Sequence, residues 1–463
     1  MKRKIHIWLM ILVLTMALLL AACGSTATNE TDSADSSAQT EETENEAAET
    51  EEEAAPEPGE ETWNTASEYS ATLITTTSIR WLSVTVGTGE DEVNLTWYSP
   101  SEETGQVLWT TADDEDFENA LTFDAVSTFA SEVTSGYYIN RATVSGLAAE
   151  TDYIYKVGND DGMSPVYSYT TPAYSDSFRF TVLGDPQLGK PVDELDNQKT
   201  TFKRVLNKVK YHFADTSFLV SLGDQVNDFD DTEQYDAFLN QAALYSLSLV
   251  PVKGNHEIGG SQYSEHYYLP NQTQYGTCDD ENDGDFWFVR GNALFLVLDL
   301  MDAVKWGEHE QFIAEACETN PDVSWRIILC HYSPYNSYED SMENAANIRP
   351  YFLSFTSAYD IDLVMTGHDH AYSRSNFILS DGSYLEYESP AVDPEGTMYV
   401  TLNSSSGSLY HRPSAQNEIS FSEYREAPEV TDVQVTPTSL TITTYEAETW
   451  EIVDTFEIQK SGE

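Results

Sequence analysis

The sequence predicts an all-β sandwich followed by an α/β domain. Between residues 67 and 172, short segments of alternating or β-branched residues, such as Val93 to Trp97, are separated by Gly, Asp and Ser turns, a pattern typical of antiparallel strands. From residue 173 to 463, apolar strand segments alternate with segments of helical spacing, which indicates helices packed on a central sheet. In such a domain, ligand chemistry lies at the strand ends.

The first 23 residues have the pattern of an export signal. Basic residues at positions 2–4 precede the apolar run Ile7 to Leu20, which is too short to span a bilayer comfortably. The run ends in Leu20-Ala21-Ala22-Cys23-Gly24, which resembles the lipobox of bacterial lipoproteins, whose cysteine is acylated. We therefore predict an extracytoplasmic protein anchored to the cell membrane through Cys23. The alternative is an ordinary secretory signal with a chance cysteine.

Residues 24–66 form a separate acidic stretch. Fourteen acidic residues and no Lys or Arg lie between Gly24 and Glu61. Such a stretch buries too little apolar surface to fold, and its like charges extend it, so we predict a disordered stalk. The whole chain has a formal net charge of −57, which argues against nucleic acid as a partner. Pairing among Cys278, Cys317 and Cys330 cannot be deduced from the sequence.

Two features support a sandwich over residues 67–172. The segment Leu147 to Tyr153 resembles the tyrosine corner of fibronectin type III domains. Trp97 lies in an apolar strand and would be the buried tryptophan of that fold. No catalytic cluster occurs in this domain, so we interpret it as a scaffold.

The elements of the second domain are predicted from their apolar periodicity. Helical spacing extends over Asp196 to Tyr211 and Tyr235 to Ser246. The tail from Val430 to Gln459 is β-rich and is assigned to the sheet of this domain. The predicted strands are Phe178 to Leu183, Phe218 to Leu222, Ala293 to Leu298, Ile327 to Cys330 and Leu363 to Met365.

Polar clusters follow the strands of this domain, most of them after a glycine that lets the chain turn sharply. The residues at these five exits are Asp185, Asp224, Asn255 with His256, His331, and His368 with His370. Each motif alone is a common turn, but five of them, each after an apolar strand, would bring two carboxylates, several imidazoles and an amide together. Oxygen and nitrogen ligands in this mixture suit zinc, manganese or iron and do not suit calcium.

This series of motifs resembles the calcineurin-like metallophosphoesterase superfamily, and the sandwich in front makes the chain most similar to the purple acid phosphatases. The resemblance implies two packed mixed sheets, two divalent metal ions (Mn, Zn or Fe) and a phosphorylated small-molecule substrate. It also implies the ligands of each metal. Asp185 and His370 would bind the first metal, Asp224 would bridge both, and Asn255, His331 and His368 would complete the second.

The resemblance further assigns roles around the metals, with two departures. His256 would be the catalytic histidine beside the phosphoryl group, and Arg374 would support the ligands from behind. Asn227 stands where purple acid phosphatases have a tyrosinate that binds ferric iron, so we expect a divalent metal pair and a colourless enzyme. Gln187 stands where many relatives have a histidine ligand, and its amide oxygen would be a weaker, neutral donor.

The function that follows is hydrolysis of phosphate monoesters by a hydroxide shared between two metals, with Asp224 and His256 as the catalytic residues. A phosphodiesterase or nucleotide hydrolase is an alternative, since Glu339-Asp340 stands where plant enzymes carry paired substrate histidines. A non-catalytic surface lipoprotein is another. The four remaining histidines of the second domain are interpreted as surface or packing residues: His212, His266, His309 and His411.

Overall fold

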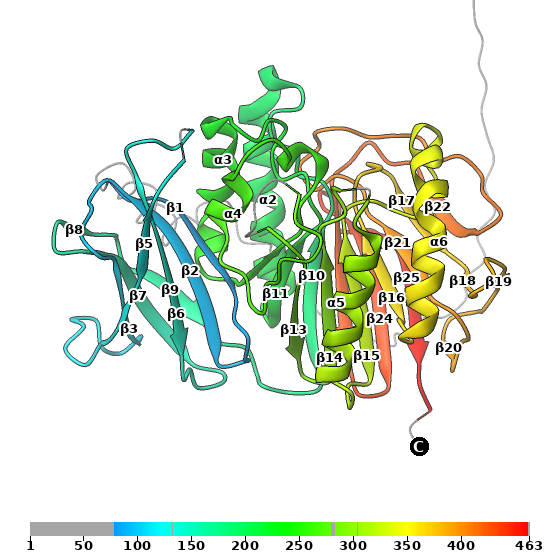
Figure 1. Cartoon of the computed structure of the whole chain (residues 1–463), viewed down its shortest axis with the longest axis horizontal. Coiled ribbons are helices and arrows are strands. Elements are labelled where there is room, and N and C mark those ends of the chain that lie inside the picture. Colours follow the sequence, from blue (N-terminus) through cyan, green and yellow to red (C-terminus); the bar gives the residue numbers. More distant parts are fainter. Residues whose placement is uncertain (1–77, 132, 279–282, 303, 462–463) are drawn as a thin grey trace, which may run out of the picture. The chain divides into compact units, whose positions relative to one another are not determined.

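The computed structural model describes residues 78–131, 133–278, 283–302 and 304–461 (Figure 1). The predicted export signal, Cys23 and the acidic stalk lie outside the described residues. Within these ranges, no helix is both long enough and apolar enough to cross a bilayer. None of the three cysteines in the described ranges forms a disulfide.

The N-terminal part is the predicted β-sandwich. Trp97 is fully buried in its core, and the hydroxyl of Tyr153 accepts the backbone N–H of Ala148 at 2.9 Å, which is the geometry of a tyrosine corner. One sheet contains β1 (Arg80–Val86), β2 (Glu92–Ser99), β6 (Tyr138–Ser145) and β5 (Val126–Phe129). The other contains β4 (Leu121–Asp124), β3 (Gln106–Thr111), β7 (Asp152–Asn159), β8 (Gly162–Met163) and β9 (Tyr167–Thr170).

The first sheet of the sandwich continues into the second domain. Strand β1 pairs in parallel with β12, with Thr85 opposite Leu249, so one 11-stranded sheet crosses the boundary at residues 172–173. The assignment of the tail is confirmed, because β23 pairs antiparallel with β10. The strands that the second domain contributes to this sheet are β12 (Leu249–Pro251), β11 (Thr216–Ser221), β10 (Phe178–Leu183), β23 (Glu429–Val435), β24 (Ser439–Glu446), β25 (Ile452–Gln459) and β20 (Ala391–Val392).

A second mixed sheet packs face to face on the first, as expected. The ring of Phe218 from the first sheet lies 5.2 Å from that of Phe295 in the second. The seven strands of the second sheet are β13 (Phe286–Arg290), β14 (Ala293–Leu298), β15 (Trp325–Cys330), β16 (Leu363–Thr366), β21 (Met398–Thr401), β17 (Tyr372–Ser375) and β22 (Ile419–Glu423).

Helices cover both outer faces of this pair of sheets. Helices α5 (Trp306–Thr319) and α6 (Met342–Ala358) lie over the second sheet (Figure 1). Helices α2 (Leu195–His212) and α3 (Thr232–Leu239) pack on the first. The smaller elements are α4 (Gln262–His266), β18 (Phe377–Ile378), β19 (Tyr384–Leu385) and four 3-10 turns at Val192–Glu194, Ala242–Tyr245, Asn255–Glu257 and Glu339–Ser341.

The predicted helix from Tyr235 to Ser246 is shorter and shifted. The Asp231 side chain caps the N-terminus of α3 by accepting the N–H of Glu233 at 2.8 Å, which starts the helix before Tyr235. The helix ends at Leu239, and a separate 3-10 turn follows. The apolar periodicity runs across this break, so the pattern could not locate it.

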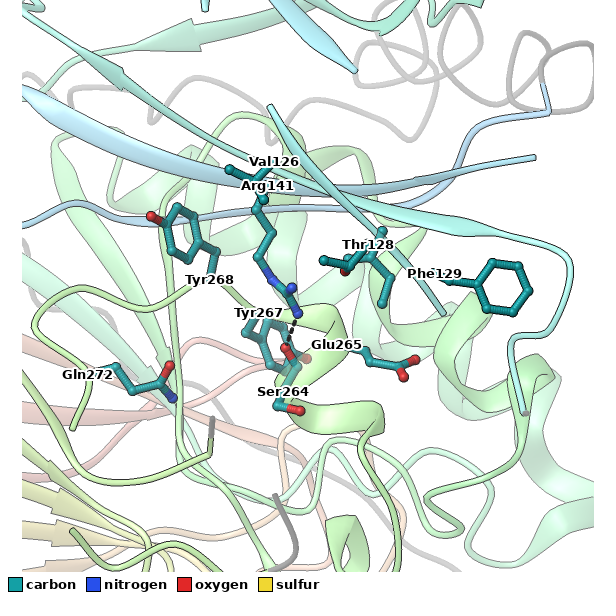
Figure 2. Close-up of a pocket in the computed structure, with 10 residues that line it drawn as sticks. Val126, Thr128, Phe129, Arg141, Ser264, Glu265, Tyr267, Tyr268 and Gln272 are labelled. Carbon is teal, nitrogen blue, oxygen red and sulfur yellow. Dashed lines mark hydrogen bonds between the residues drawn. The ribbon is translucent and has the colours of Figure 1, made fainter. Parts of the chain in front are cut away.

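A cavity of about 540 Å³ lies where the sandwich meets the second domain (Figure 2). Strand β5 and the segment after α4 line it, and the Arg141 guanidinium reaches across it to the carbonyl of Ser264 at 2.6 Å. None of the residues predicted for the site lines this cavity. The contact ties the two domains together at a distance from the predicted chemistry.

Candidate metal centre

The carboxyl ends of strands from both sheets meet at one place, and the predicted ligands gather there. Asp185 follows β10 and Asp224 follows β11 in the first sheet. His331 follows β15, and His368 and His370 follow β16 in the second. Because the sheets pack face to face, the loops after these strands lie together across the interface.

The ligand atoms form two overlapping groups. Atoms of Asp224, His331 and His368 all lie within 4.8 Å of one another, and so do atoms of Asp185, Asp224 and His370. Asp224 belongs to both groups, which is the position predicted for a bridging carboxylate. Asn255 joins the first group, since its Oδ1 lies 3.1 Å from His331 Nε2.

The orientation of His331 is fixed from behind. Its Nδ1 donates to the carbonyl of Leu222 at 2.8 Å. Its Nε2 therefore faces Asp224, whose Oδ2 is 3.3 Å away. A second hydrogen bond that fixes the tautomer and ring orientation is typical of histidines that bind metals.

The electrostatics of the cluster are those of a site that needs cations. Burial and the neighbouring Asp224 raise the pKa of Asp185. Burial also opposes ionisation of Asp224, but His331 and His256 outweigh it and lower the pKa of this carboxyl. Burial disfavours the charged form of His331 as well, yet Asp224 and Asp185 raise its pKa to about 10. In this arrangement the proton on His331 supplies the positive charge beside the two carboxylates that a bound cation would otherwise supply.

The other two imidazoles are held neutral. Burial lowers the pKa of both His368 and His370 to about 3. Nδ1 of each ring is buried without a hydrogen-bond partner among the described residues, and so is Oε1 of Gln187. Neutral imidazoles, a carboxylate pair and an unpartnered amide oxygen fit divalent cations, so the residues present suit the predicted metals.

The backbone at these positions is strained. Asp185, Gln187, Asp224, His368 and His370 all have positive φ, between 23° and 73°. Residues other than glycine rarely adopt this region, and such conformations cluster at functional sites. Five of the seven predicted ligands share this conformation, which seven other non-glycine residues among those described also adopt.

Two glycines are required for close approach of the loops. Gly223 has φ of 93°, and a Cβ there would meet His331 Nδ1 at 2.5 Å. A Cβ on Gly254 would meet Asp224 Oδ1 at 2.2 Å. At both positions, glycine is therefore needed because a side chain would clash with a predicted ligand. Only at Gly223 is it also needed for a sharp turn of the backbone.

Glu257 joins two of the loops, a role that the sequence did not reveal. Its fully buried carboxylate accepts backbone N–H groups of Asp224, Gln225, Val226 and Gly254 at 2.8–3.3 Å. The sequence signal that could have indicated this role is the position of Glu257 directly after His256 in the Gly-Asn-His-Glu motif. The carboxylate holds the loop of Asp224 against the loop of Asn255.

Further buried groups hold the other loops. Asp369, between the two ligand histidines, accepts the hydroxyl of Ser341 at 2.6 Å. Ser404 donates its hydroxyl to the carbonyl of Asp185 at 3.0 Å, and Ser406 donates to the carbonyl of Pro186. The serines lie more than two hundred residues from Asp185, so only the fold brings them there.

Asn227 and Arg374 have different partners in the structure. The backbone carbonyl of Asn227, not its side chain, accepts Nδ1–H of His256 at 2.6 Å. Arg374 pairs with Asp454 of β25 at 2.7 Å and touches no ligand. The interpretation of Arg374 as a residue that supports the ligands from behind is therefore corrected, since it links β17 to β25.

Of the four histidines interpreted as surface or packing residues, one lies at the site. His411 lines the pocket, and its Nδ1 lies 3.0 Å from the carbonyl of Asp369. His309 is buried and paired with Asp285 at 2.7 Å, and His212 stacks on Trp450. His266 is buried among aromatic rings in α4.

A pocket of about 290 Å³ opens over the cluster. Its floor includes Asp224, Asn255, His368 and His370, while Asp185 and His331 lie buried beneath. The lining residues that are partly or fully exposed form the rim: Lys190, His256, Tyr338, Asp340, Asn344, Leu409 and His411. The buried Gln187 and Ser341 also line the pocket.

Replacing Glu257 by Gln tests whether its carboxylate holds the loops. The amide would turn N–H groups toward backbone donors, and leaving buried donors unpaired costs about 1–3 kcal/mol each. We expect lower stability in urea unfolding and reduced metal content. The same change at exposed Glu233 is the control. Stability and metal content equal to those of the unaltered protein would contradict this role.

The chain is similar to known phosphoesterases along much of its length. Residues 81–171 match the family model for the N-terminal domain of purple acid phosphatase, and residues 178–372 match the model for calcineurin-like phosphoesterase. Purple acid phosphatase 1 of Ipomoea batatas is 23% identical over 359 residues, which cover 72% of this chain and 73% of that protein. A phosphoenolpyruvate phosphatase of Allium cepa is 27% identical over 288 residues, or 58% of each chain.

The solved structure of a purple acid phosphatase from yellow lupin (Lupinus luteus) seeds has the same fold. It matches with a TM-score of 0.66 at 16% identity and covers 83% of this chain and 75% of that chain. With ligand groups present for two divalent metal ions, the chain belongs to the calcineurin-like phosphoesterases and is a metal-dependent phosphoesterase of the purple acid phosphatase type.

Proposed function

We propose that this chain hydrolyses phosphate monoesters at the outer face of a cell membrane. The observation that carries the proposal is Asp224, whose carboxylate belongs to both ligand groups on the floor of an open pocket. The name of the Allium cepa relative, a phosphoenolpyruvate phosphatase, supports a monoester as the substrate class.

The ligand assignment is part of the proposal. Asp185, His370 and the amide oxygen of Gln187 would hold the first metal, and Asn255, His331 and His368 the second, with Asp224 shared. Two bound divalent ions would supply an acidified water and offset charge on the phosphoryl oxygens. They would also more than neutralise the two carboxylates, so the site would be positive within a chain of net charge −57. Salt screens the outer charges beyond about 8–10 Å.

We assign proton transfer to His256. Nδ1 donates to the Asn227 carbonyl, so Nε2 is the nitrogen that faces the cluster, 4.0 Å from Asp224 Oδ2. The ring is partly exposed at the rim. From there it would protonate or orient the leaving oxygen of the ester. Because the attacking group comes from water, no nucleophile from the protein is required.

The direct test compares an aryl phosphate monoester with the matching diester. With manganese, zinc or iron added to metal-free protein, we expect the monoester to be favoured by at least about tenfold in kcat/KM. The loaded protein should be colourless, because Asn227 provides no phenolate. Faster diester hydrolysis would support the phosphodiesterase alternative, and no hydrolysis with any of the metals would refute the proposal.

Variants separate metal binding from proton transfer. We expect Asp224→Asn and His331→Ala to lose bound metal, and with it the activity. His256→Ala should keep both metals and lose about 10²–10⁴-fold in rate. Metal analysis and steady-state kinetics distinguish the two classes, with exposed Asp230→Asn as control. Unchanged metal content in Asp224→Asn would contradict its bridging role.

The location rests on the N-terminal sequence and has its own test. In a bacterial host, the full chain should fractionate with membranes, because acyl chains on Cys23 anchor it. Cys23→Ser should release the protein into the soluble fraction with unchanged specific activity. Membrane association that survives the Cys23→Ser change would overturn the anchor.

A further inference from the structure

The pocket over the metal centre contains one lysine and no arginine. Lys190 is that lysine, and the other charged lining residues are the carboxylates Asp224 and Asp340 and the histidines. The chain has 22 Lys and Arg residues against 79 acidic ones. A lysine in this position is therefore not explained by a generally basic surface.

The backbone of Lys190 is held by a buried amide of α2. Gln198 is 4% exposed, and its Oε1 accepts the N–H of Gly189 at 2.7 Å. Its Nε2 donates to the carbonyl of Lys190 at 2.5 Å. The N–H of Lys190 donates to the carbonyl of Gln187 at 3.2 Å, which links the segment to a predicted metal ligand. These hydrogen bonds fix the backbone of Lys190 beside the first ligand group.

The ammonium group of Lys190 has no partner among the described residues. Its Nζ makes no hydrogen bond, and no described carboxylate lies within 4.0 Å of it. By contrast, Lys253 and Lys460 are paired with aspartates. The charge on Lys190 is available to a ligand in the pocket.

Lys190 and His256 both line the pocket. Charges on His256 and Lys190 both act on Asp228 and, after its hydrogen bonds from Gln234 and Asn227, lower the pKa of its carboxyl. Asp228 directly follows Asn227, whose carbonyl holds the His256 ring. Lys190 therefore lines the same pocket in which the phosphoryl group and its leaving oxygen would meet His256.

We propose that Lys190 binds a non-esterified oxygen of a dianionic phosphate monoester and is the residue that selects monoesters over diesters. The inference rests on the proposed function and deepens it. A phosphate monoester carries about −1.5 to −2 charges at neutral pH, whereas a diester carries one. A lysine is a point charge that attracts the additional negative charge. In a diester, that oxygen carries a second organic group, so both the charge and the contact are lost.

A carboxylate in the pocket lining, Asp340, strengthens the discrimination. Asp340 is exposed and lines the pocket, and its carboxylate accepts the hydroxyl of Tyr338 at 2.8 Å. Tyr338 is in turn stacked on His411, with ring centroids 3.8 Å apart. Because the Asp340 carboxylate repels anionic oxygens and the Lys190 ammonium attracts them, the anionic oxygens of a substrate are drawn toward Lys190.

The test uses Lys190→Met and Lys190→Arg, with Lys199→Met on the exposed side of α2 as the matched control. In Lys190→Met we expect KM for an aryl monoester to rise about tenfold, because one charge-assisted contact is lost. The kcat should stay within about threefold of that of the unaltered protein. The kcat/KM for the diester should stay within about twofold. Lys190→Arg should recover most of the loss. Metal content and melting temperature should match those of the unaltered protein.

The affinity of the metal-loaded protein for inorganic phosphate tests the role of Lys190 without relying on catalytic turnover. Calorimetry should show about tenfold weaker binding in Lys190→Met and no change in Lys199→Met. Equal losses on monoester and diester, or no change on either, would overturn the inference while leaving the proposed hydrolysis in place. If the unaltered protein binds phosphate through Lys190 but hydrolyses neither ester, the proposed function fails and the inference about Lys190 stands.

Discussion

Two carboxylates buried side by side are the constraint on which this structure depends. Asp185 and Asp224 are almost completely buried, and their ion-pair partners within the described chain are histidines alone. Burial of carboxylates is costly unless opposite charge and hydrogen bonds compensate it. Divalent cations supply that charge most effectively, and the strained ligand backbones indicate that the fold enforces this arrangement rather than relaxing away from it.

The supporting structure explains how the strain is sustained. Two sheets packed face to face bring the ends of their strands together, and helices on both outer faces keep the sheets in place. Buried acceptors then fasten the loops, with Glu257 joining the loops of Asp224 and Asn255. The sandwich belongs to the same framework, because β1 extends the first sheet beside β12. Rigid elements are what hold catalytic side chains within the narrow tolerance that chemistry needs.

Most of the fold and the ligand cluster could be predicted from the sequence because both follow local patterns. Asp185, Asp224, Asn255, His331, His368 and His370 each follow an apolar strand, so sheet geometry alone implies convergence. Contacts between distant segments could not be predicted. Ser404 reaches Asp185, and Arg374 pairs with Asp454 instead of supporting a ligand. The end of α3 at Leu239 was missed because apolar periodicity continues past it.

The measurement that tests the central claim most directly is anomalous diffraction from crystals of the manganese-loaded protein. The account predicts two peaks about 3.5–4 Å apart, one on each side of the Asp224 carboxylate. The first should lie against Asp185 and His370, and the second against His331 and His368. A single peak, or peaks away from Asp224, would contradict it.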